Sequence, residues 1–161
     1  MRLQHTIPPL YDERSKVLIL GSFPSVKSRE TGFFYGHPQN RYWRVLASLW
    51  DESVPQTVEE KRAFLLKHRI AAWDVIADCD ITGSSDASIR DAIPNDLSGI
   101  FEVADIRAVF VNGTTAAKLY RKHMTQYPDC VVLPSTSPAN AAWSLERLCE
   151  VWKTVKEKTE D

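Results

Sequence analysis

Residues 16–43 read KVLILGSFPSVKSRETGFFYGHPQNRYW, and this stretch decides the fold class. It opens with the apolar run Val17–Leu20, which is short enough to be a strand buried on both faces, as in a parallel sheet. Gly21 ends the run, and Ser22–Ser25 forms a turn with hydroxyl side chains and one proline. A long irregular loop is expected to follow, with a helix beginning near Arg41. Ligands of open α/β sheets bind beyond the carboxyl ends of strands, and long loops in small domains are usually functional, so we expect the chemistry here.

Apolar runs and capping signals divide the rest of the chain into alternating strands and helices. Three further strands are expected at Ile70–Cys79, Ile106–Val111 and Cys130–Leu133. Helices are expected from near Arg41 to Trp50, from the Thr57 capping box to about His68, around Leu97–Val103, from Thr114 to about Met124, and near the end around Leu148 and Trp152. Residues 1–15 are expected to pack over the sheet as an arm, and Asp80–Asn95 to be polar with one helical turn at Ala87–Ala92. This order predicts a single domain over residues 1–161, with a three-layer α/β/α architecture and a four-stranded parallel sheet.

The composition excludes several classes of protein. The chain has 161 residues and a formal net charge of −1, with 43% hydrophobic and 25% charged residues, which is ordinary for a globular domain. No apolar run approaches the roughly 20 residues needed to span a bilayer, and no signal peptide is visible. Three scattered cysteines favour a reducing compartment, so we expect a cytoplasmic protein, associated with the nucleoid if the source is bacterial. Three thiolates are too few for an ordinary iron–sulfur cluster.

Polar residues follow three of the predicted strands. Gly21-Ser22, Asn112-Gly113 and Ser135–Ser137 each stand where a strand ends. Any one of them could be an ordinary turn. Because the carboxyl ends of parallel strands meet at one edge of a sheet, the three together predict a pocket.

Two features of the long loop have both a structural and a functional interpretation. Phe33, Phe34 and Tyr35 could close the core, or they could form a platform on which a planar ligand such as a nucleobase stacks. Asn40 stands just before a helix, where asparagine is among the best capping residues. Its amide could instead orient a water molecule or a substrate group, and the sequence leaves both interpretations open.

Other kinds of site find little support. Serine hydrolases need a G-x-S-x-G elbow followed by an acid and a histidine, and no histidine follows position 123, so an esterase using Ser22 or Ser25 is disfavoured. No P-loop or GxGxxG motif is present. The histidines lack metal-ligand spacing, so no zinc site is expected, and three of them are expected to be exposed: His5, His68 and His123. Basic residues near the expected pocket give weak support for phosphate contacts: Lys27, Arg29, Arg41 and Arg44.

These residues resemble the uracil-DNA glycosylase superfamily, and within it the hypoxanthine-DNA (DNA-deoxyinosine) glycosylase branch. Gly21–Ser25 stands where the superfamily has its first motif, and Leu133–Asn140 where it has its second. Gly32–Trp43 is similar to the corresponding segment of the mismatch-specific uracil glycosylases. Further segments that resemble the hypoxanthine branch are Trp73–Val75, Gly83-Ser84 to Arg90, and Phe110–Gly113. The resemblance covers essentially the whole chain and implies a fold like that of uracil-DNA glycosylase.

Because the sequence departs from the superfamily pattern at two positions, the catalytic residue is expected at a different place in the chain. Phe23 stands where many members have an Asp or Asn that positions water, and Ser135 stands where many have a histidine. The resemblance to the hypoxanthine branch implies that the catalytic amide is the asparagine of the H-P-x-N segment, which is Asn40.

The resemblance also implies roles for other residues. The amide of Asn112 could meet both the O6 acceptor and the N1–H donor of hypoxanthine, a pattern that adenine reverses. Tyr35 is the expected stacking partner of a flipped base, and residues 140–143 follow the second motif, where the superfamily carries its wedge. The expected base-binding residues are Ser22, Phe23, Phe34, Tyr35, Asp74 and Asn112. The expected phosphate-binding and wedge residues are Ser25, Ser28, Ser135, Ser137 and Asn140.

We therefore expect a monofunctional DNA glycosylase that hydrolyses the N-glycosidic bond of deaminated bases in base excision repair, with hypoxanthine as its first substrate. It is expected to need no metal or cofactor, to act as a monomer on damaged DNA, duplex or single-stranded, and to make no membrane contact. Two alternatives remain open: a glycosylase of the same superfamily that prefers uracil or xanthine, and a non-catalytic module that binds nucleotides or modified bases. Release of a base from lesion-containing duplex distinguishes an enzyme from a module.

Overall fold

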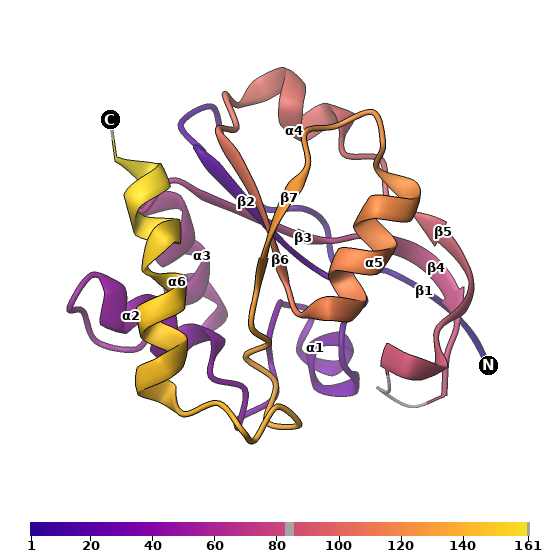
Figure 1. Ribbon diagram of the computed structural model, residues 1–161, viewed down its shortest axis with the longest axis horizontal. Helices are drawn as coiled ribbons and strands as arrows, with labels where there is room; N and C mark the ends of the chain where they lie inside the picture. The colour runs from indigo at the N-terminus through magenta and orange to yellow at the C-terminus, as the bar shows by residue number, and fades with distance from the viewer. Residues whose placement is uncertain (83–85, 161) are drawn as a thin grey trace.

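A four-stranded parallel sheet lies at the centre of the molecule. The computed structural model describes residues 1–82 and 86–160 (Figure 1), so that Gly83 and Ser84 of the family resemblance lie outside the described residues. The strand order is β3-β2-β6-β7, and every neighbouring pair is parallel. The strands span Val17–Gly21 (β2), Ile70–Asp74 (β3), Ala108–Asn112 (β6) and Cys130–Leu133 (β7). The predicted parallel sheet is confirmed, and all residues of β2 are buried, as expected for an apolar strand covered on both faces.

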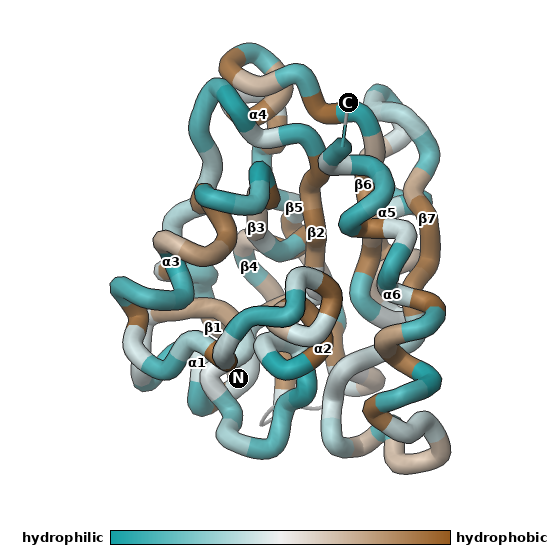
Figure 2. The backbone as a smooth tube through the Cα atoms, turned by 90° about the vertical axis from the view of Figure 1, so that its left-hand side faces the viewer, coloured by the Kyte–Doolittle hydropathy of each residue, from teal (hydrophilic) through white to brown (hydrophobic). Residues whose placement is uncertain are grey.

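Helices cover both faces of this sheet (Figure 1). One face carries α2 (Tyr42–Leu49), α3 (Val58–Lys67) and α6 (Leu145–Thr159), and the other carries α4 (Ser98–Val103) and α5 (Thr114–His123). Along β2, Val17 and Ile19 face the first group, whereas Leu18 and Leu20 face the second. Figure 2 shows hydrophobic residues along β2, β6 and β7 and mostly hydrophilic ones on the outer segments. The predicted three-layer α/β/α architecture is confirmed.

The amino-terminal ends of α3 and α5 differ in their capping. The predicted capping box is confirmed, since the hydroxyl of Thr57 accepts the N–H of Glu60 and the carboxylate of Glu60 accepts the N–H of Thr57, both at 3.0 Å. α5 begins at Thr114, as predicted, but no side chain caps it. Thr114 is the first residue of the helix, and Gly113 precedes it with a φ of 101° and no capping side chain. No helix in the described part of the chain combines the length and the apolar character needed to cross a membrane.

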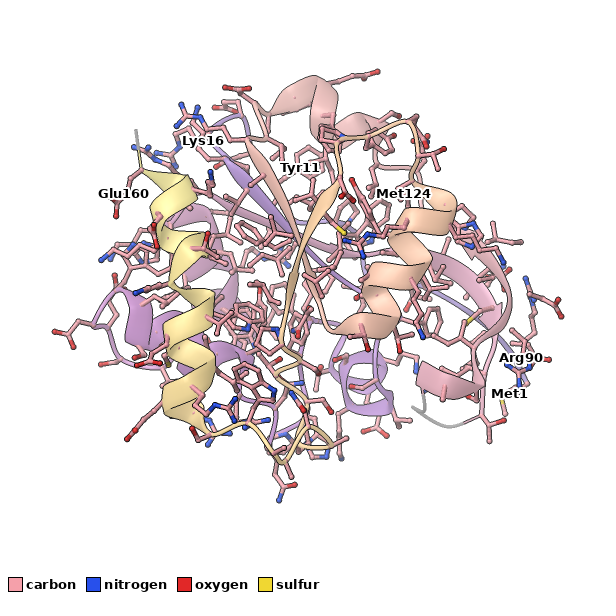
Figure 3. The ribbon with its side chains drawn as sticks, viewed as in Figure 1. Met1, Tyr11, Lys16, Arg90, Met124 and Glu160 are labelled. Carbon is pink, nitrogen blue, oxygen red and sulfur yellow. The ribbon has the colours of Figure 1, made fainter. Side chains whose placement is uncertain are left out.

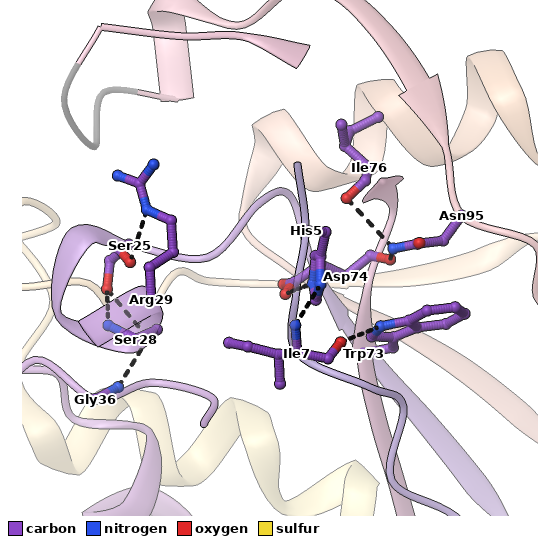
Figure 4. Close-up of polar contacts among 10 residues, drawn as sticks. All are labelled: His5, Ile7, Ser25, Ser28, Arg29, Gly36, Trp73, Asp74, Ile76 and Asn95. Atoms are coloured by element: carbon purple, nitrogen blue, oxygen red, sulfur yellow. Dashed lines mark hydrogen bonds and ion pairs between the residues drawn. The ribbon is translucent and has the colours of Figure 1, made fainter. Parts of the chain in front are cut away.

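The single strand predicted over Ile70–Cys79 is in fact two strands that belong to different sheets. After β3 ends at Asp74, β4 (Ile76–Asp80) joins a three-stranded antiparallel sheet with the order β1-β4-β5. The amide of Asn95 donates to the carbonyls of Asp74 and Ile76 on either side of the change of direction (Figure 4). Asp74 therefore stands at the carboxyl end of β3, the edge strand of the parallel sheet, and not inside a longer strand.

Segments predicted as arm and loop form the outer strands of the second sheet. β1 (Arg2–Gln4) and β5 (Arg90–Pro94) pair with β4 from opposite sides. The N-terminal amino group lies 2.6 Å from Oδ1 of Asp80, and Figure 3 shows Met1 and Arg90 at the same end of this sheet. The predicted helical turn at Ala87–Ala92 is wrong, because a 3₁₀ turn covers Asp86–Ser88 and a strand follows. Three to five residues per strand are too few to reveal an alternating pattern in the sequence.

A short helix replaces the first part of the irregular loop predicted after β2. α1 spans Val26–Thr31, and the hydroxyl of Ser25 caps it by accepting the N–H of Ser28 at 3.1 Å. Gly32 ends the helix in the left-handed conformation, with a φ of 74°. Six residues make fewer than two turns, which is too short for an apolar repeat, so this helix could not be predicted from the sequence.

Candidate active site

A cavity of about 750 Å³ lies at the carboxyl ends of the four parallel strands. All of the residues predicted for the site line it: Ser22, Phe23, Ser25, Ser28, Phe34, Tyr35, Asn40, Asp74, Asn112, Ser135, Ser137 and Asn140. The parallel sheet brings these residues together because its strand ends meet at one edge. Ser22, Phe23, Phe34 and Asp74 are buried, whereas Tyr35, Asn40 and Asn112 are half-buried and offer surface to a ligand.

The aromatic loop divides between the core and the pocket. Phe33 and Phe34 are buried and pack edge to face, with ring centroids 5.2 Å apart. The ring of Tyr35 stacks on the ring of Tyr42, with centroids 3.8 Å apart and an interplanar angle of 13°. The carbonyl of Tyr35 accepts the indole N–H of Trp43 at 3.2 Å. Tyr42 therefore holds the Tyr35 ring in place, in the wall of the cavity.

The hydroxyls of Ser25 and Ser28 stabilise the loop from within. Ser25 Oγ donates to Ser28 Oγ at 3.1 Å, and Ser28 Oγ accepts the N–H of Gly36 at 2.9 Å (Figure 4). Ser28 is only 2% exposed. The prediction that Ser28 contacts a DNA phosphate is therefore corrected, because a buried hydroxyl with two partners joins α1 to the aromatic loop and cannot reach a phosphate. Ser25 is half-buried, and a phosphate contact remains the prediction for it.

Asn40 stabilises the first turn of α2 from one residue before the N-cap. Its Oδ1 accepts the N–H of Tyr42, the first helical residue, at 2.9 Å. The N-cap residue is Arg41, which makes no capping side-chain bond, so the expectation that Asn40 is itself the N-cap is wrong. The bond to Tyr42 leaves the Asn40 side chain able to bind a ligand, because a carbonyl oxygen has a second lone pair and the amide nitrogen has no hydrogen-bond partner among the described residues. Asn40 thus presents a well-positioned amide to the pocket.

Asn112 has both of its polar side-chain atoms engaged by one neighbour. Its Nδ2 donates to Oγ1 of Thr136 at 2.9 Å, and its Oδ1 accepts the N–H of Thr136 at 3.0 Å. Thr136 is fully buried. The prediction that Asn112 meets both O6 and N1–H of hypoxanthine is therefore revised: it retains one N–H and one lone pair for a ligand, and its main contact joins β6 to the loop after β7.

Asp74 contributes the carboxylate of the pocket, and His5 holds it. Nε2 of His5 lies 2.8 Å from Oδ2 of Asp74, and the two side chains are 1% and 6% exposed (Figure 4). The prediction that His5 is exposed is wrong, because the N-terminal arm covers this end of β3. The phenol of Tyr42 lies near the same carboxylate. Burial, and after it the nearby Tyr35 and Asp74, raise the pKa of Tyr42 well above its usual value, so the phenol stays neutral.

Arg41 clamps the loop that follows β7. Its guanidinium donates to the carbonyls of Ser137 and Asn140, each at 3.0 Å, and to that of Trp143. Its backbone N–H donates to the carbonyl of Thr136 at 3.0 Å. Three guanidinium bonds to backbone carbonyls leave Arg41 poorly suited to the phosphate contact that the basic cluster suggested. Its position instead couples the residue beside Asn40 to the loop of the second motif.

The loop after β7 is further held by its own side chains. Ser135 Oγ accepts the N–H of Ser137, Ser137 Oγ accepts the N–H of Ala139, and the amide of Asn140 donates to the carbonyl of Ser135 at 3.0 Å. The predicted wedge role of Asn140 is therefore corrected, because its side chain folds back into the loop. The exposed positions of this segment are Pro138, Ala139, Ala141 and Ala142. The hydroxyls of Ser135 and Ser137 can still donate to a ligand.

Gly21 allows the Asp74 carboxylate its position, and Gly21→Ala is expected to destabilise the site. An alanine Cβ would lie 2.4 Å from Oδ1 of Asp74, a carboxylate that His5 holds in place. We expect the free energy of unfolding to fall by about 1–3 kcal/mol, as for other overpacked positions. Thermal or urea unfolding measures this. Gly99→Ala is the matched control, since its nearest neighbour is the Tyr11 hydroxyl at 3.4 Å, and it should unfold like the parent protein or slightly later. Equal unfolding of the two variants would contradict this account.

The sequence carries no signal for the roles of His5, Thr136 and Arg41. His5 stands outside every motif, Thr136 lies inside the second motif without a predicted contact, and Arg41 is one of several neighbouring basic residues. In the described part of the chain, no three side chains of the types His, Cys, Asp and Glu gather in a way that could hold a metal ion. The chemistry on offer is an amide, a carboxylate, several hydroxyls and one stacking ring around a cavity large enough for a nucleobase.

Comparisons with known proteins point to one family. The model of the "Uracil DNA glycosylase superfamily" matches residues 8–157. A "Hypoxanthine DNA glycosylase" of Methanosarcina acetivorans is 36% identical over 155 residues, which are 95% of this chain and 98% of that protein. One of Methanosarcina barkeri is 32% identical over 135 residues, 83% of this chain and 85% of that protein. The solution NMR structure of a candidate uracil DNA glycosylase from M. acetivorans superimposes with a TM-score of 0.81 at 34% identity, covering 100% of both chains.

Proposed function

This chain belongs to the uracil DNA glycosylase superfamily, and on that premise we propose that it is a monofunctional DNA glycosylase that releases hypoxanthine before any other deaminated base. The observation that carries the proposal is the Asp74 carboxylate in the pocket wall. Deamination of adenine replaces the N1 lone pair with an N1–H donor. An ionised carboxylate only accepts hydrogen bonds, so it pairs with N1–H of hypoxanthine and repels the lone pair of adenine.

The base reaches such a pocket only after it has left the helical stack. Flipping costs least at a mispair such as inosine opposite thymine, which favours lesions over normal pairs. The flipped base is proposed to stack on the ring of Tyr35, which lines the cavity and is held by Tyr42. The exposed tip of the loop after β7, residues 138–142, is proposed to enter the gap left in the duplex, with Ser25, Ser135 and Ser137 contacting the flanking phosphates.

Asn40 is proposed to hold the attacking water. Cleavage of the N-glycosidic bond places oxocarbenium character on the sugar and negative charge on the departing base. An amide is no strong base, so its contribution is to orient the water for attack on C1′, and the bond from Tyr42 N–H to its oxygen makes that orientation rigid. Donors at the rim of the pocket, among them the remaining N–H of Asn112, are proposed to stabilise the leaving base. Asp74 contributes to recognition, since a carboxylate does not stabilise an anion.

Single-turnover release from a panel of duplexes tests this function. Matched duplexes carry hypoxanthine, uracil, xanthine or ethenoadenine, and we expect hypoxanthine to be released faster than the other bases and equally fast with a chelator present. Faster release of uracil or xanthine would transfer the proposal to the alternative glycosylases. Binding to lesion duplex without any release would support a non-catalytic module. Loss of release in the chelator would contradict metal-free catalysis.

Tyr35→Ala is expected to weaken binding to lesion duplex by about 1–3 kcal/mol, the usual contribution of a base stacked on an aromatic side chain. Binding to undamaged duplex should change little, because an unflipped base does not reach Tyr35. Fluorescence anisotropy on the two duplexes measures the difference. Equal weakening on both would return Tyr35 to a structural role. Tyr35→Phe serves as control and should bind lesion duplex nearly as well as the parent protein.

Further properties are proposed on the same premise. The chain is proposed to form one glycosylase domain over residues 1–161 and to act as a monomer. Its proposed location is the cytoplasm, and both duplex and single-stranded lesions are proposed substrates. Sedimentation of the protein alone and with lesion DNA tests the stoichiometry.

A further inference from the structure

His5 contacts the pocket carboxylate from outside the pocket. Its Nε2 lies 2.8 Å from Oδ2 of Asp74 (Figure 4). Asp74 lines the cavity, and His5 is not among the residues that line it. The two oxygens of Asp74 are therefore different: Oδ2 faces the histidine, and Oδ1 lies against Gly21, where the Cβ of an alanine would be 2.4 Å away.

The surroundings of His5 determine which ring nitrogen carries the proton. Its Nδ1 accepts the N–H of Ile7 at 3.2 Å, so Nδ1 has no hydrogen and Nε2 is the ring nitrogen that carries one. Nε2–H therefore donates to the carboxylate. The carbonyl of Ile7 accepts the indole N–H of Trp73 at 2.9 Å, and the rings of Phe23 and Trp73 pack edge to face against the imidazole. These contacts hold the histidine in one orientation.

The histidine bond also holds the carboxylate. The terminal torsion of an aspartate is soft, and an unbonded carboxylate can turn both oxygens toward a ligand. The bond from His5 removes this freedom and turns Oδ2 toward the histidine, which is not among the residues that line the cavity. Oδ1 is then the acceptor that Asp74 offers to a base.

We propose that His5 is a specificity-determining residue that excludes guanine by leaving Asp74 a single acceptor for the base. This inference rests on the proposed function. It extends that function by naming how the site rejects the normal base that most resembles hypoxanthine.

The chemistry of the two bases explains why one oxygen matters. Hypoxanthine and guanine share O6 and N1–H, and guanine adds a 2-amino group next to N1. A carboxylate with both oxygens free would pair with N1–H and the 2-amino group together, and would prefer guanine. Because Oδ2 is turned toward His5, which is not among the residues that line the cavity, the 2-amino group of guanine has no second carboxylate oxygen facing it. A buried donor without a partner disfavours binding.

Binding to non-cleavable duplexes tests the inference. The probes are duplexes with 2′-fluoroarabino-deoxyinosine or 2′-fluoroarabino-deoxyguanosine opposite thymine, in which fluorine slows cleavage and both bases form wobble pairs of similar flipping cost. The full chain is compared with His5→Phe, which keeps a ring but has no donor, and with His5→Gln, whose amide N–H restores the donor. We expect the wild-type protein to prefer inosine at least about tenfold. The preference should fall at least about fivefold in His5→Phe and return in His5→Gln.

The ratio of the two affinities separates specificity from folding, because a loss of folded protein lowers both affinities by the same factor. An unchanged ratio in a His5→Phe protein that melts cooperatively would overturn the inference. Equal wild-type affinity for the two duplexes would overturn it without any variant, even if His5→Phe fails to fold. The proposed function is tested separately by wild-type release of hypoxanthine from the ordinary inosine duplex. If no base is released there, the proposed function fails whatever the ratio.

Discussion

Replacing Asp74 with asparagine is expected to lower the rate of hypoxanthine release by about 10²- to 10⁴-fold. Nε2–H of His5 still needs an acceptor, so the oxygen of the new amide turns toward it and the NH₂ group turns toward Gly21 and the pocket. N1–H of hypoxanthine then meets donors in place of a carboxylate. Losing a hydrogen bond to a charged group costs about 1.5–3 kcal/mol, unpaired buried donors add about 1–3 kcal/mol, and each 1.36 kcal/mol is tenfold.

Single-turnover release from inosine duplex measures this effect, with thermal unfolding as the check on folding. Asp105→Asn is the matched control, because its side chain is 78% exposed at the opposite end of the sheet and should leave the rate unchanged. Binding of adenine-containing duplex is the second readout and should improve relative to inosine duplex, since the amide can donate to N1 of adenine. An Asp74→Asn protein that releases hypoxanthine near the parent rate would show that Asp74 does not contact the base.

The parallel sheet could be predicted from the sequence because each of three of its strands is a separate apolar run. Val17–Leu20, Ile106–Val111 and Cys130–Leu133 are apolar runs between turn residues, and runs of this kind are typical of strands buried on both faces. The second sheet had no such signal. Its strands are half-exposed, and one of them continues directly from β3, so the apolar run over Ile70–Cys79 gave no sign that the chain changes sheets after Asp74.

The contacts that organise the pocket could not be predicted because they join residues far apart in the chain. His5 and Asp74 are 69 positions apart, and Arg41 reaches carbonyls 96 to 102 positions away. A motif gives residue types and their order, but it does not say which polar atoms have already found partners. Ser28 illustrates this: it stands in a segment that was expected to bind phosphate, and it is buried with its hydroxyl engaged.

Asn40→Ser separates the two roles that the structure gives Asn40. The hydroxyl of serine can accept the N–H of Tyr42 as the amide does, and serine caps helices about as well as asparagine. The free energy of unfolding should therefore stay within a few tenths of a kcal/mol. The hydroxyl is too short to place an amide oxygen and nitrogen at the same points of the pocket. The single-turnover rate should fall by about 10²-fold or more, the effect of misplacing a reacting group by about 1 Å.

Asn40→Asp is the matched control for this prediction. An aspartate keeps an oxygen where Oδ1 accepts the N–H of Tyr42, and its second oxygen can still hold a water, so it should retain more activity than serine at equal stability. Lesion binding should survive in both variants, because the Tyr35 ring and the phosphate contacts remain. A serine variant that melts like the parent protein and releases hypoxanthine at a near-parent rate would limit Asn40 to stabilising the first turn of α2. The positioning of water would then have to be assigned to Asn112, which retains one N–H and one lone pair beside its bonds to Thr136, or to Oδ1 of Asp74 at the pocket wall.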